Sequence, residues 1–395
     1  MPLSARPRIP SSIWLLGFVS MLMDISSELI HSLLPLFMVT SLGISVWTVG
    51  LIEGLAEATA LVVKVFSGAL SDYWGKRKGI VVFGYALGAF TKPLFALASG
   101  AGLVIAARLI DRVGKGIRSA PRDALIADIV PPEVRGAAFG LRQSLDTVGA
   151  FVGPLLGVGL MLLWSNDFRA VFWVAVIPGM LAVALMLGVK EPDTPKAPLK
   201  SAPFSRLSLK RLGADYCWVV GIGGVFTLAR FSEAFLLLRA QQSGIALAYV
   251  PLVLVAMNVV YAASAYPFGR LSDHMPHVTL LALGLVVLIA GDVVLAISTS
   301  AWHLLLGVTL WGVHMGITQG LLATMVAATA PEDLRGTAYG VFNLICGLTL
   351  LMASLIAGWI WDQHGADMTF YTGAFFALLA LLGLRLRWKF LKDLD

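Results

Sequence analysis

The sequence predicts an all-α polytopic membrane protein built from two similar halves. Its 395 residues are 58% hydrophobic and 13% charged, and the mean hydropathy is +0.85. A soluble protein of this composition would expose a far too apolar surface. Apolar runs of about 20 residues, long enough to cross a bilayer as helices, recur along the whole chain. A transmembrane β-barrel is excluded because its strands would alternate apolar and polar residues.

Twelve transmembrane helices follow from these runs. The apolar run that follows the basic stretch MPLSARPRIPSS is too long for the core of a signal peptide, and no small-residue cleavage site closes it, so we expect an uncleaved first helix. A polar stretch rich in Pro, Ser and Lys follows the sixth span and predicts a linker. The predicted division is an N-terminal six-helix bundle (1–190), a cytosolic linker (191–214) and a C-terminal six-helix bundle (215–395). The expected spans are 12–39, 45–70, 79–99, 101–123, 136–163, 168–189, 215–239, 246–268, 278–298, 301–328, 336–361 and 369–390.

Basic residues predict the orientation in the membrane. With the N-terminus in the cytosol, about twenty Lys and Arg residues fall on the cytosolic side, whereas the outer loops hold Arg169 and Arg239. We therefore expect both termini in the cytosol and a multi-pass protein of the cell (inner) membrane. The net charge of +6 is then a topology signal, and no nucleic-acid partner is expected.

Two stretches of the first half return about 200 residues later. PPEVRGAAFG at 131–140 returns as PEDLRGTAYG at 331–340, and GALSD at 68–72 returns as GRLSD at 269–273. Two independent segments at nearly one offset indicate a duplicated six-helix unit, which is a transporter architecture.

Three motifs on this duplicated unit carry a family resemblance. GALSDYWGKRK at 68–78, ARLIDRVGKG at 107–116 and GLRQSLDTVGAFVGPLLG at 140–157 resemble motifs A, B and the antiporter motif C of the major facilitator superfamily. Arg112 stands where motif B usually has a glycine, and Val158 replaces the last glycine of motif C. The resemblance implies the fold of that superfamily, with two pseudo-symmetric six-helix bundles. The matching residues are Gly68, Asp72, Gly75, Lys76 and Arg77 (A), Arg108, Gly114 and Gly116 (B), and Gly140, Gly149, Gly153, Pro154 and Gly157 (C).

The motif A region is expected to act as a conformational latch, because the family resemblance implies that it holds the outward-facing state. Asp72 lies at the cytosolic end of its helix, where an anion can face a helix N-terminus or pair with a cation. We expect Arg118 or Arg122 to pair with it. The alternative is that the basic residues of the motif only determine topology. The predicted latch residues are Gly68, Asp72, Lys76, Arg77, Arg118 and Arg122.

Motif C predicts close helix packing. Gly149, Gly153 and Gly157 recur every four residues and form one smooth face. Pro154 can bend the helix beside that face.

The stretch DRVGKGIRSAPRDALIAD at 111–128 concentrates charge in an apolar chain. Shifted by 200 residues, Asp111 becomes Trp311, and the second half builds the same helix without these charges. The fold therefore does not require them, and function is the better explanation. At membrane depth each such charge costs roughly 2.5–3.5 kcal/mol. Four charges spaced i, i+3, i+4 and i+7 share one face, namely Arg108, Asp111, Arg112 and Lys115.

A second charged face lies on the first helix, where Asp24, Glu28 and His31 are spaced i, i+4 and i+7. A carboxylate beside an Arg in a medium of low dielectric can switch between ion pair and protonated acid as substrate enters, which is the chemistry of proton coupling. Glu28 is the first candidate for the proton carrier, since it has a repeat counterpart in Glu233, and Asp24 is the second. The alternative is a set of buried ion pairs that only fix helix packing.

The family resemblance places helices 1, 4, 7 and 10 around a central cavity, and this selects the predicted pathway for substrate and protons. A hydrogen-bonded packing role is an equally good interpretation of the two histidines in it. The pathway residues are Asp24, Glu28, His31, Arg108, Asp111, Arg112, Arg230, Glu233 and His314.

These features predict a secondary active transporter for a small organic, charged or polar solute. Motif C favours proton-coupled antiport and efflux; the alternative is proton-coupled symport for uptake of an organic anion or a metal chelate. No GxxxxGK[ST] phosphate loop occurs, and the six histidines lack zinc-type spacing, so we expect no nucleotide-driven pump, enzyme, cofactor or metal site. The expected partners are the solute, protons and the lipid bilayer, with the chain as a monomer.

Overall fold

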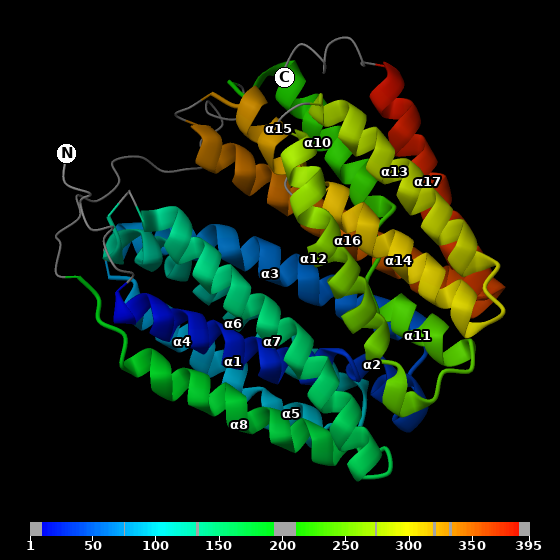
Figure 1. The fold of residues 1–395 in the computed structure, drawn as a ribbon, viewed down its shortest axis with the longest axis horizontal. Helices are drawn as coiled ribbons and strands as arrows, with labels where there is room; N and C mark the ends of the chain where they lie inside the picture. The colour runs from blue at the N-terminus through cyan, green and yellow to red at the C-terminus, as the bar shows by residue number, and fades with distance from the viewer. Residues whose placement is uncertain are drawn as a thin grey trace. The chain divides into compact units, whose positions relative to one another are not determined.

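The computed structural model describes residues 10–74, 76–131, 134–192, 211–272, 275–318, 321–331 and 334–386. Helices joined by short turns make up this described part of the chain, in which no strand occurs (Figure 1). The all-α class predicted from the sequence is thereby confirmed. Gly75 and the side chain of Asp72, both expected to belong to the latch motif, lie outside the described residues.

The chain packs as two compact units. The N-terminal unit contains the described parts of Met1–His31 and Val63–Lys200. The C-terminal unit contains the described parts of Ser32–Val62 and Ser201–Asp395. The helix α3 (Val46–Trp74) belongs partly to each unit. Residues 32–62, predicted to lie in the N-terminal bundle, are grouped with the C-terminal unit. The bundle boundaries expected from the sequence stay a prediction.

The helices of the N-terminal unit, besides the last part of α3, are α1 (Ser11–His31), α4 (Lys78–Phe90), α5 (Lys92–Ala96), α6 (Ala101–Ile129), α7 (Arg135–Leu163) and α8 (Phe168–Leu187). The C-terminal unit contains α2 (Leu34–Leu36), a π-helical turn (Phe37–Ser41), the first part of α3, α10 (Gly213–Leu228), α11 (Ala234–Gln242), a 3-10 turn (Leu247–Tyr249), α12 (Leu252–Ser272), α13 (His277–Ala296), α14 (Ala301–Thr318), α15 (Leu321–Thr329), α16 (Arg335–His364) and α17 (Ala366–Leu386).

The two units use the same helix pairings. In the N-terminal unit α1 packs on α7 and α8, and α4 packs on α6 and α8. In the C-terminal unit α10 packs on α16 and α17, and α13 packs on α14 and α17. Each pairing of the first unit therefore recurs in the second, as a duplicated sequence requires.

The first part of α3 belongs to the C-terminal unit through contacts with α16. The backbone N–H groups of Val46 and Trp47 donate to the carboxylate of Asp362, at 3.2 and 2.9 Å. A carboxylate that accepts N–H groups at a helix N-terminus satisfies donors that have no partner within the helix. A Cβ added at Gly50 would collide with the carbonyl oxygen of Ser354, so the two backbones lie close together.

Eight helical stretches of the described chain are long and apolar enough to cross a membrane. The charged α6 is not among them, because any 18-residue window of it contains more than two charged residues. The eight stretches are Ser11–Ser41, Lys78–Ala96, Arg135–Leu163, Phe168–Leu187, Leu247–Leu271, His277–Ala296, Thr337–His364 and Ala366–Arg385.

Three predicted spans are interrupted helices. After α1 ends at His31, Pro35 has no N–H to donate to the carbonyl of His31. Pro93 stands at the start of α5, after the turn at Thr91. Residues 229–233 separate α10 from α11. The continuous helices expected at these three places are therefore corrected to interrupted ones.

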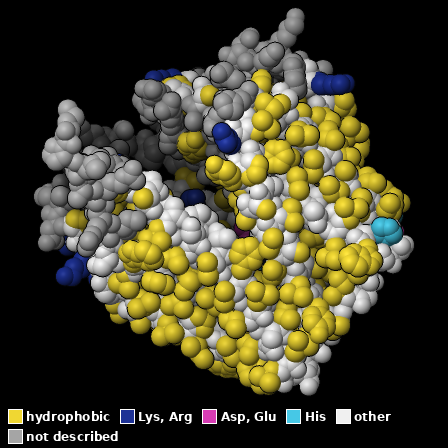
Figure 2. Space-filling model, in the orientation of Figure 1, with side chains coloured by type: hydrophobic (Ala, Val, Ile, Leu, Met, Phe, Trp, Pro, Cys, Tyr) yellow, Lys and Arg dark blue, Asp and Glu magenta, His cyan; other side chains and the backbone are white. Residues whose placement is uncertain are grey.

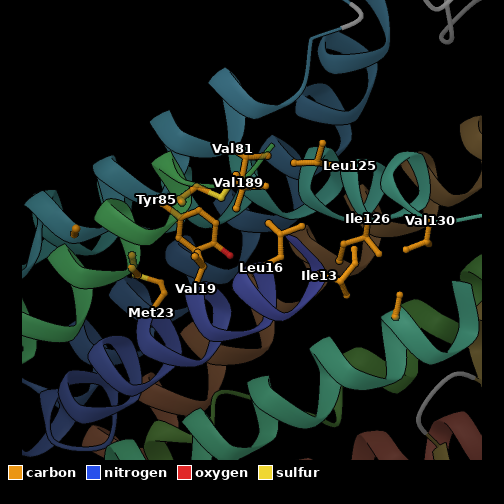
Figure 3. Close-up of a cluster of buried hydrophobic side chains, with 14 of the residues drawn as sticks. Ile13, Leu16, Val19, Met23, Val81, Tyr85, Leu125, Ile126, Val130 and Val189 are labelled. Carbon is orange, nitrogen blue, oxygen red and sulfur yellow. The ribbon is translucent and has the colours of Figure 1, made fainter. Parts of the chain in front are cut away.

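A cluster of buried apolar side chains holds the N-terminal unit together. Figure 3 shows Leu16 and Val19 of α1 close to Tyr85 of α4, with Leu125 and Ile126 of α6 in the same cluster. Lipid tails are as apolar as these side chains, so the cluster stabilises a membrane protein by van der Waals packing more than by exclusion of water.

Hydrophobic side chains also cover most of the described surface in the view of Figure 2. Large apolar side chains are exposed along several helices, among them Phe83 of α4, Ile177 of α8 and Trp302 of α14, which is 82% exposed. Contiguous apolar surface of this kind marks contact with a nonaqueous partner, and for helices of this length that partner is the lipid bilayer.

Candidate functional site

A buried polar cluster joins α1, α5 and α6 in the N-terminal unit, with Lys92 at its centre. The Lys92 ammonium donates to Oδ1 of Asp111 at 2.8 Å and to Oγ of Ser27 at 3.0 Å. The side chain of Lys92 is fully buried and that of Asp111 is 3% exposed. This pair therefore lies among the most completely enclosed charges of the described chain.

His31 extends the cluster along α1. Its Nε2 lies 3.6 Å from Oδ2 of Asp111, and its Nδ1 lies 3.7 Å from Oε1 of Glu28. Nη2 of Arg112 lies 2.9 and 3.0 Å from the two ring nitrogens. One imidazole ring thus connects two carboxylates and a guanidinium, so a change of charge at any one of them acts on the others.

Close backbone contacts make this cluster possible. A Cβ added at Gly114 would lie 2.8 Å from the carbonyl oxygen of Gly84, so α4 and α6 approach each other without intervening side chains. The turn at Thr91 then ends α4, and Lys92 begins α5 opposite Asp111. Only small residues permit such an approach.

The motif C glycines bring α7 equally close to the charged face of α1. A Cβ added at Gly149 would lie 2.9 Å from Cβ of Asp24, and one at Gly153 would lie 2.8 Å from Cβ of Glu28. Gly157 and Pro154 are also buried in α7. The two proposed proton carriers therefore lie on the part of α1 that these glycines contact.

Three further charged residues lie in the same unit. Arg108 of α6 is 3% exposed and shares the buried face with Asp111. On α7, Arg142 Nη1 donates to Oδ2 of Asp146 at 2.6 Å. The N-terminal unit therefore holds largely buried charges on four helices, α1, α5, α6 and α7.

The motif A region makes a different set of contacts. Nε of Arg77 lies 3.0 Å from Oδ2 of Asp128 near the end of α6. The carboxylate of Glu191 accepts the backbone N–H groups of Arg77 and Lys78 at the start of α4. Lys76 is exposed. These contacts tie the beginning of α4 to the ends of α6 and α8.

Arg118 and Arg122 contact Tyr85, a residue that the sequence analysis did not single out. The Arg118 guanidinium lies 4.8 Å from the centre of the Tyr85 ring. Nη1 of Arg122 lies 3.2 Å from Ser20 Oγ and 3.5 Å from the Tyr85 hydroxyl. The predicted pairing of either arginine with Asp72 concerns a side chain outside the described residues and stays a prediction.

In the C-terminal unit the predicted residues lie at the interruption between α10 and α11. Arg230 lies in this interruption, with its guanidinium 5.8 Å from the centre of the Phe226 ring. Glu233 precedes α11. His314 of α14 is fully buried, its Nδ1 lies 2.7 Å from the Gly284 carbonyl oxygen, and its ring packs on Phe226 at 5.5 Å. Interrupted helices of this kind form solute and ion sites in transporters.

Comparison with known proteins identifies the family of this chain. The model of the Major Facilitator Superfamily matches residues 16–348 and 225–393. This chain belongs to the major facilitator superfamily. An uncharacterized MFS-type transporter of Methanocaldococcus jannaschii is 34% identical over 94% of both chains. The multidrug resistance protein MdtH of Yersinia pestis is 24% identical over 95% of this chain and 94% of its own. The crystal structure of a bacterial homologue of the human lysosomal transporter Spinster is 16% identical, with a TM-score of 0.80 over 98% of both chains.

Membership of the superfamily confirms the predicted fold and makes the chain a multi-pass membrane transporter. Superfamily transporters are generally not enzymes. Lys92 belongs to none of the three motifs quoted above and is not among the pathway residues predicted from the sequence. The available signal was a lysine inside an otherwise apolar run, because a charge at membrane depth needs a partner.

Proposed function

We propose that this transporter exchanges protons for a small organic, charged or polar solute and exports the solute by alternating access. The observation that carries the proposal is the chain of contacts from Glu28, whose side chain is 30% exposed, through His31 and Asp111 to the buried Lys92. A purely structural ion pair needs two partners, whereas this cluster links two carboxylates, an imidazole and two cations. Protonation of one carboxylate changes how the neighbouring cations are paired, so binding of a proton and binding of a solute at this cluster depend on each other.

The charge balance of the cluster supports a solute with an anionic group. The faces of α1, α5 and α6 carry four cations and three carboxylates, which leaves one positive charge when His31 is neutral. The cations are Lys92, Arg108, Arg112 and the exposed Lys115, and the carboxylates are Asp24, Glu28 and Asp111. A guanidinium keeps its charge and binds carboxylate or phosphate through two parallel hydrogen bonds. Arg112 and Arg108 are the proposed solute-binding residues, and Glu28, then Asp24, the proposed proton carriers. The remaining proposed pathway residues are His31, Asp111, Arg230, Glu233 and His314.

The proposed direction is export, with the proton entering as the solute leaves. Support comes from the antiporter motif C, whose glycines contact α1 at Asp24 and Glu28, and from the likeness to a multidrug resistance protein. The proposal includes an inner-membrane location and cytosolic termini.

The alternative is symport, in which an organic anion or a metal chelate enters with a proton. The surplus positive charge of these three helix faces favours symport, because an anion bound there would neutralise it. The two directions differ in a measurable way: an outward solute gradient drives protons inward in antiport and outward in symport.

The test uses the purified full-length protein in liposomes that contain a pH-sensitive dye. A panel of organic anions and zwitterions is first screened by thermal stabilisation, since a ligand that binds the folded state raises its apparent stability. Solutes that stabilise the protein are then loaded into the liposomes, and proton movement across the membrane is followed with the dye. Proton movement opposite to the solute supports antiport, movement with the solute supports symport, and solute transport without proton movement overturns the proposal.

Two variants identify the carrier. Glu28→Gln should abolish transport driven by a pH gradient while solute exchange at equal concentrations continues, and Asp24→Asn is tested in the same way. Asp367→Asn is the matched control, because that carboxylate is 60% exposed. If both Glu28→Gln and Asp24→Asn retain full gradient-driven transport, the proton site lies elsewhere, and Asp111 or Asp146 is the next candidate.

A further inference from the structure

The C-terminal unit repeats the geometry of the Lys92–Asp111 pair with different chemistry. Position 92 corresponds to 292 and position 111 to 311 at the repeat offset of 200 residues. Lys92 donates to Asp111 at 2.8 Å, and Trp311 Nε1 donates to Oδ1 of Asp292, also at 2.8 Å. The duplicated fold therefore places an acid where the first unit has a lysine, and an indole where the first unit has the counter-ion.

Asp292 is fully buried in a hydrophobic setting. It is 0% exposed, and its Oδ2 has no hydrogen-bond partner among the described residues. Phe231 packs against Trp311 at 5.7 Å and against Phe370 at 5.5 Å, between ring centres. A Cβ added at Gly373 of α17 would lie 2.7 Å from Asp292 Oδ2 and 2.9 Å from the Phe231 ring. Apart from the indole N–H, the groups shown next to this carboxyl group are the backbone at Gly373 and the aromatic rings that pack on Trp311.

The charged groups on the neighbouring elements make their contacts elsewhere. On α14, His314 lies against the Gly284 carbonyl oxygen and His303 is exposed. On α11, Arg239 donates to the carbonyls of Leu295, Ala296 and Ser298 and pairs with Asp367 of α17 at 2.9 Å. The other described charged or titratable side chains on or next to these elements are Tyr371 and Arg385 (α17), His364 before α17, His277 (α13), and Arg230 and Glu233 before α11.

We propose that Asp292 is a second proton-binding site, a carboxylic acid that holds its proton between α13, α14 and α17. An ionised carboxylate taken out of water costs several kcal/mol unless a cation and hydrogen bonds compensate it. Asp111 has Lys92, His31 and Arg112 beside it, whereas Asp292 has one indole N–H. A neutral acid needs no counter-ion and keeps Oδ1 as the acceptor.

The packing also crowds one side of this carboxyl group. The backbone of α17 at Gly373 is so close to Oδ2 of Asp292 that a methyl group would collide there. This inference rests on the geometry of the C-terminal unit and is independent of whether Glu28 couples protons to transport.

Infrared spectroscopy of the purified full-length protein at neutral pH tests the inference. The C=O stretch of a protonated carboxylic acid is separate from the bands of carboxylates. Labelling aspartate with ¹³C at the carboxyl carbon should shift an acid band of the unsubstituted protein, and Asp292→Asn should remove that band. Trp311→Phe removes the indole donor, so the same band should move to higher frequency without loss of intensity.

The matched control is Asp367→Asn, which changes an exposed aspartate and should leave the acid band unchanged. The Asp292→Asn protein is first checked for folding by size exclusion and thermal melting; if it does not fold, the labelled protein and Trp311→Phe still decide. Loss of carboxylate absorption in Asp292→Asn with no change in the acid band would overturn the inference. So would the finding that Trp311→Phe moves no aspartate acid band.

Discussion

The ion pair between Lys92 and Asp111 should be one of the most sensitive points of the N-terminal unit. The two side chains are 0% and 3% exposed and lie 2.8 Å apart. Removal of one member of such a pair leaves an uncompensated buried charge, which costs about 3–5 kcal/mol. We expect Lys92→Met and Asp111→Asn each to lower the free energy of unfolding by about this amount. The free energy of unfolding is measured by denaturant titration of the purified protein in detergent micelles.

The double variant Lys92→Met/Asp111→Asn distinguishes loss of this ion pair from destabilisation that has nothing to do with the pair. With both charges gone, no buried charge is left alone, so the combined loss should be smaller than the sum of the two single losses by about 0.5–3 kcal/mol. The control is Asp367→Asn, whose carboxylate lies 2.9 Å from Arg239 but is 60% exposed. A pair with one exposed partner contributes about 0–1 kcal/mol, and Arg239 also keeps its backbone acceptors.

Two results would refute the reasoning. If the losses of the single variants simply add in the double variant, Lys92 and Asp111 do not stabilise each other. If Lys92→Met costs no more than Asp367→Asn, the buried cluster tolerates an unpaired carboxylate, which would mean that water or His31 and Arg112 compensate it.

Three further outcomes are expected. Gly153→Ala should destabilise the protein by about 1–3 kcal/mol because its Cβ would lie 2.8 Å from a Cβ of α1. Gly159→Ala on the same helix is the control, since its Cβ would meet nothing within 4 Å. Equal unfolding curves for the two variants would contradict the close packing. Reporter fusions after Trp164 and after Lys190 should report opposite sides of the membrane, and same-side signals would exclude the topology. Asp72→Asn should reduce transport and shift the populations of inward- and outward-facing states, read from spin-label distances; unchanged populations would count against the latch.

Much of the fold could be predicted from the sequence because the signals are local. An apolar run long enough to cross the bilayer is a helix, since the backbone must satisfy its own hydrogen bonds in lipid. The predicted span 136–163 agrees with α7 at Arg135–Leu163. The motifs and the 200-residue repeat identified the superfamily. The i, i+3, i+4 spacing placed Arg108, Asp111 and Arg112 on one face of α6, which is buried, whereas Lys115, predicted on the same face, is exposed.

Tertiary structure alone decided which charges meet. Helical spacing determines which residues share a face, but not which helix packs against that face or how far along it. The contact of Lys92 with Asp111 depends on the close approach of α4 and α6 at their glycines and on the turn at Thr91. Likewise, Arg77 meets Asp128, and Asp292 receives an indole instead of a cation, because packing brings together residues from helices that are separate in the sequence. A charged residue in an apolar run indicates that its side chain needs a partner. Only the packing of the helices determines whether that partner is an ion, an aromatic ring or a proton.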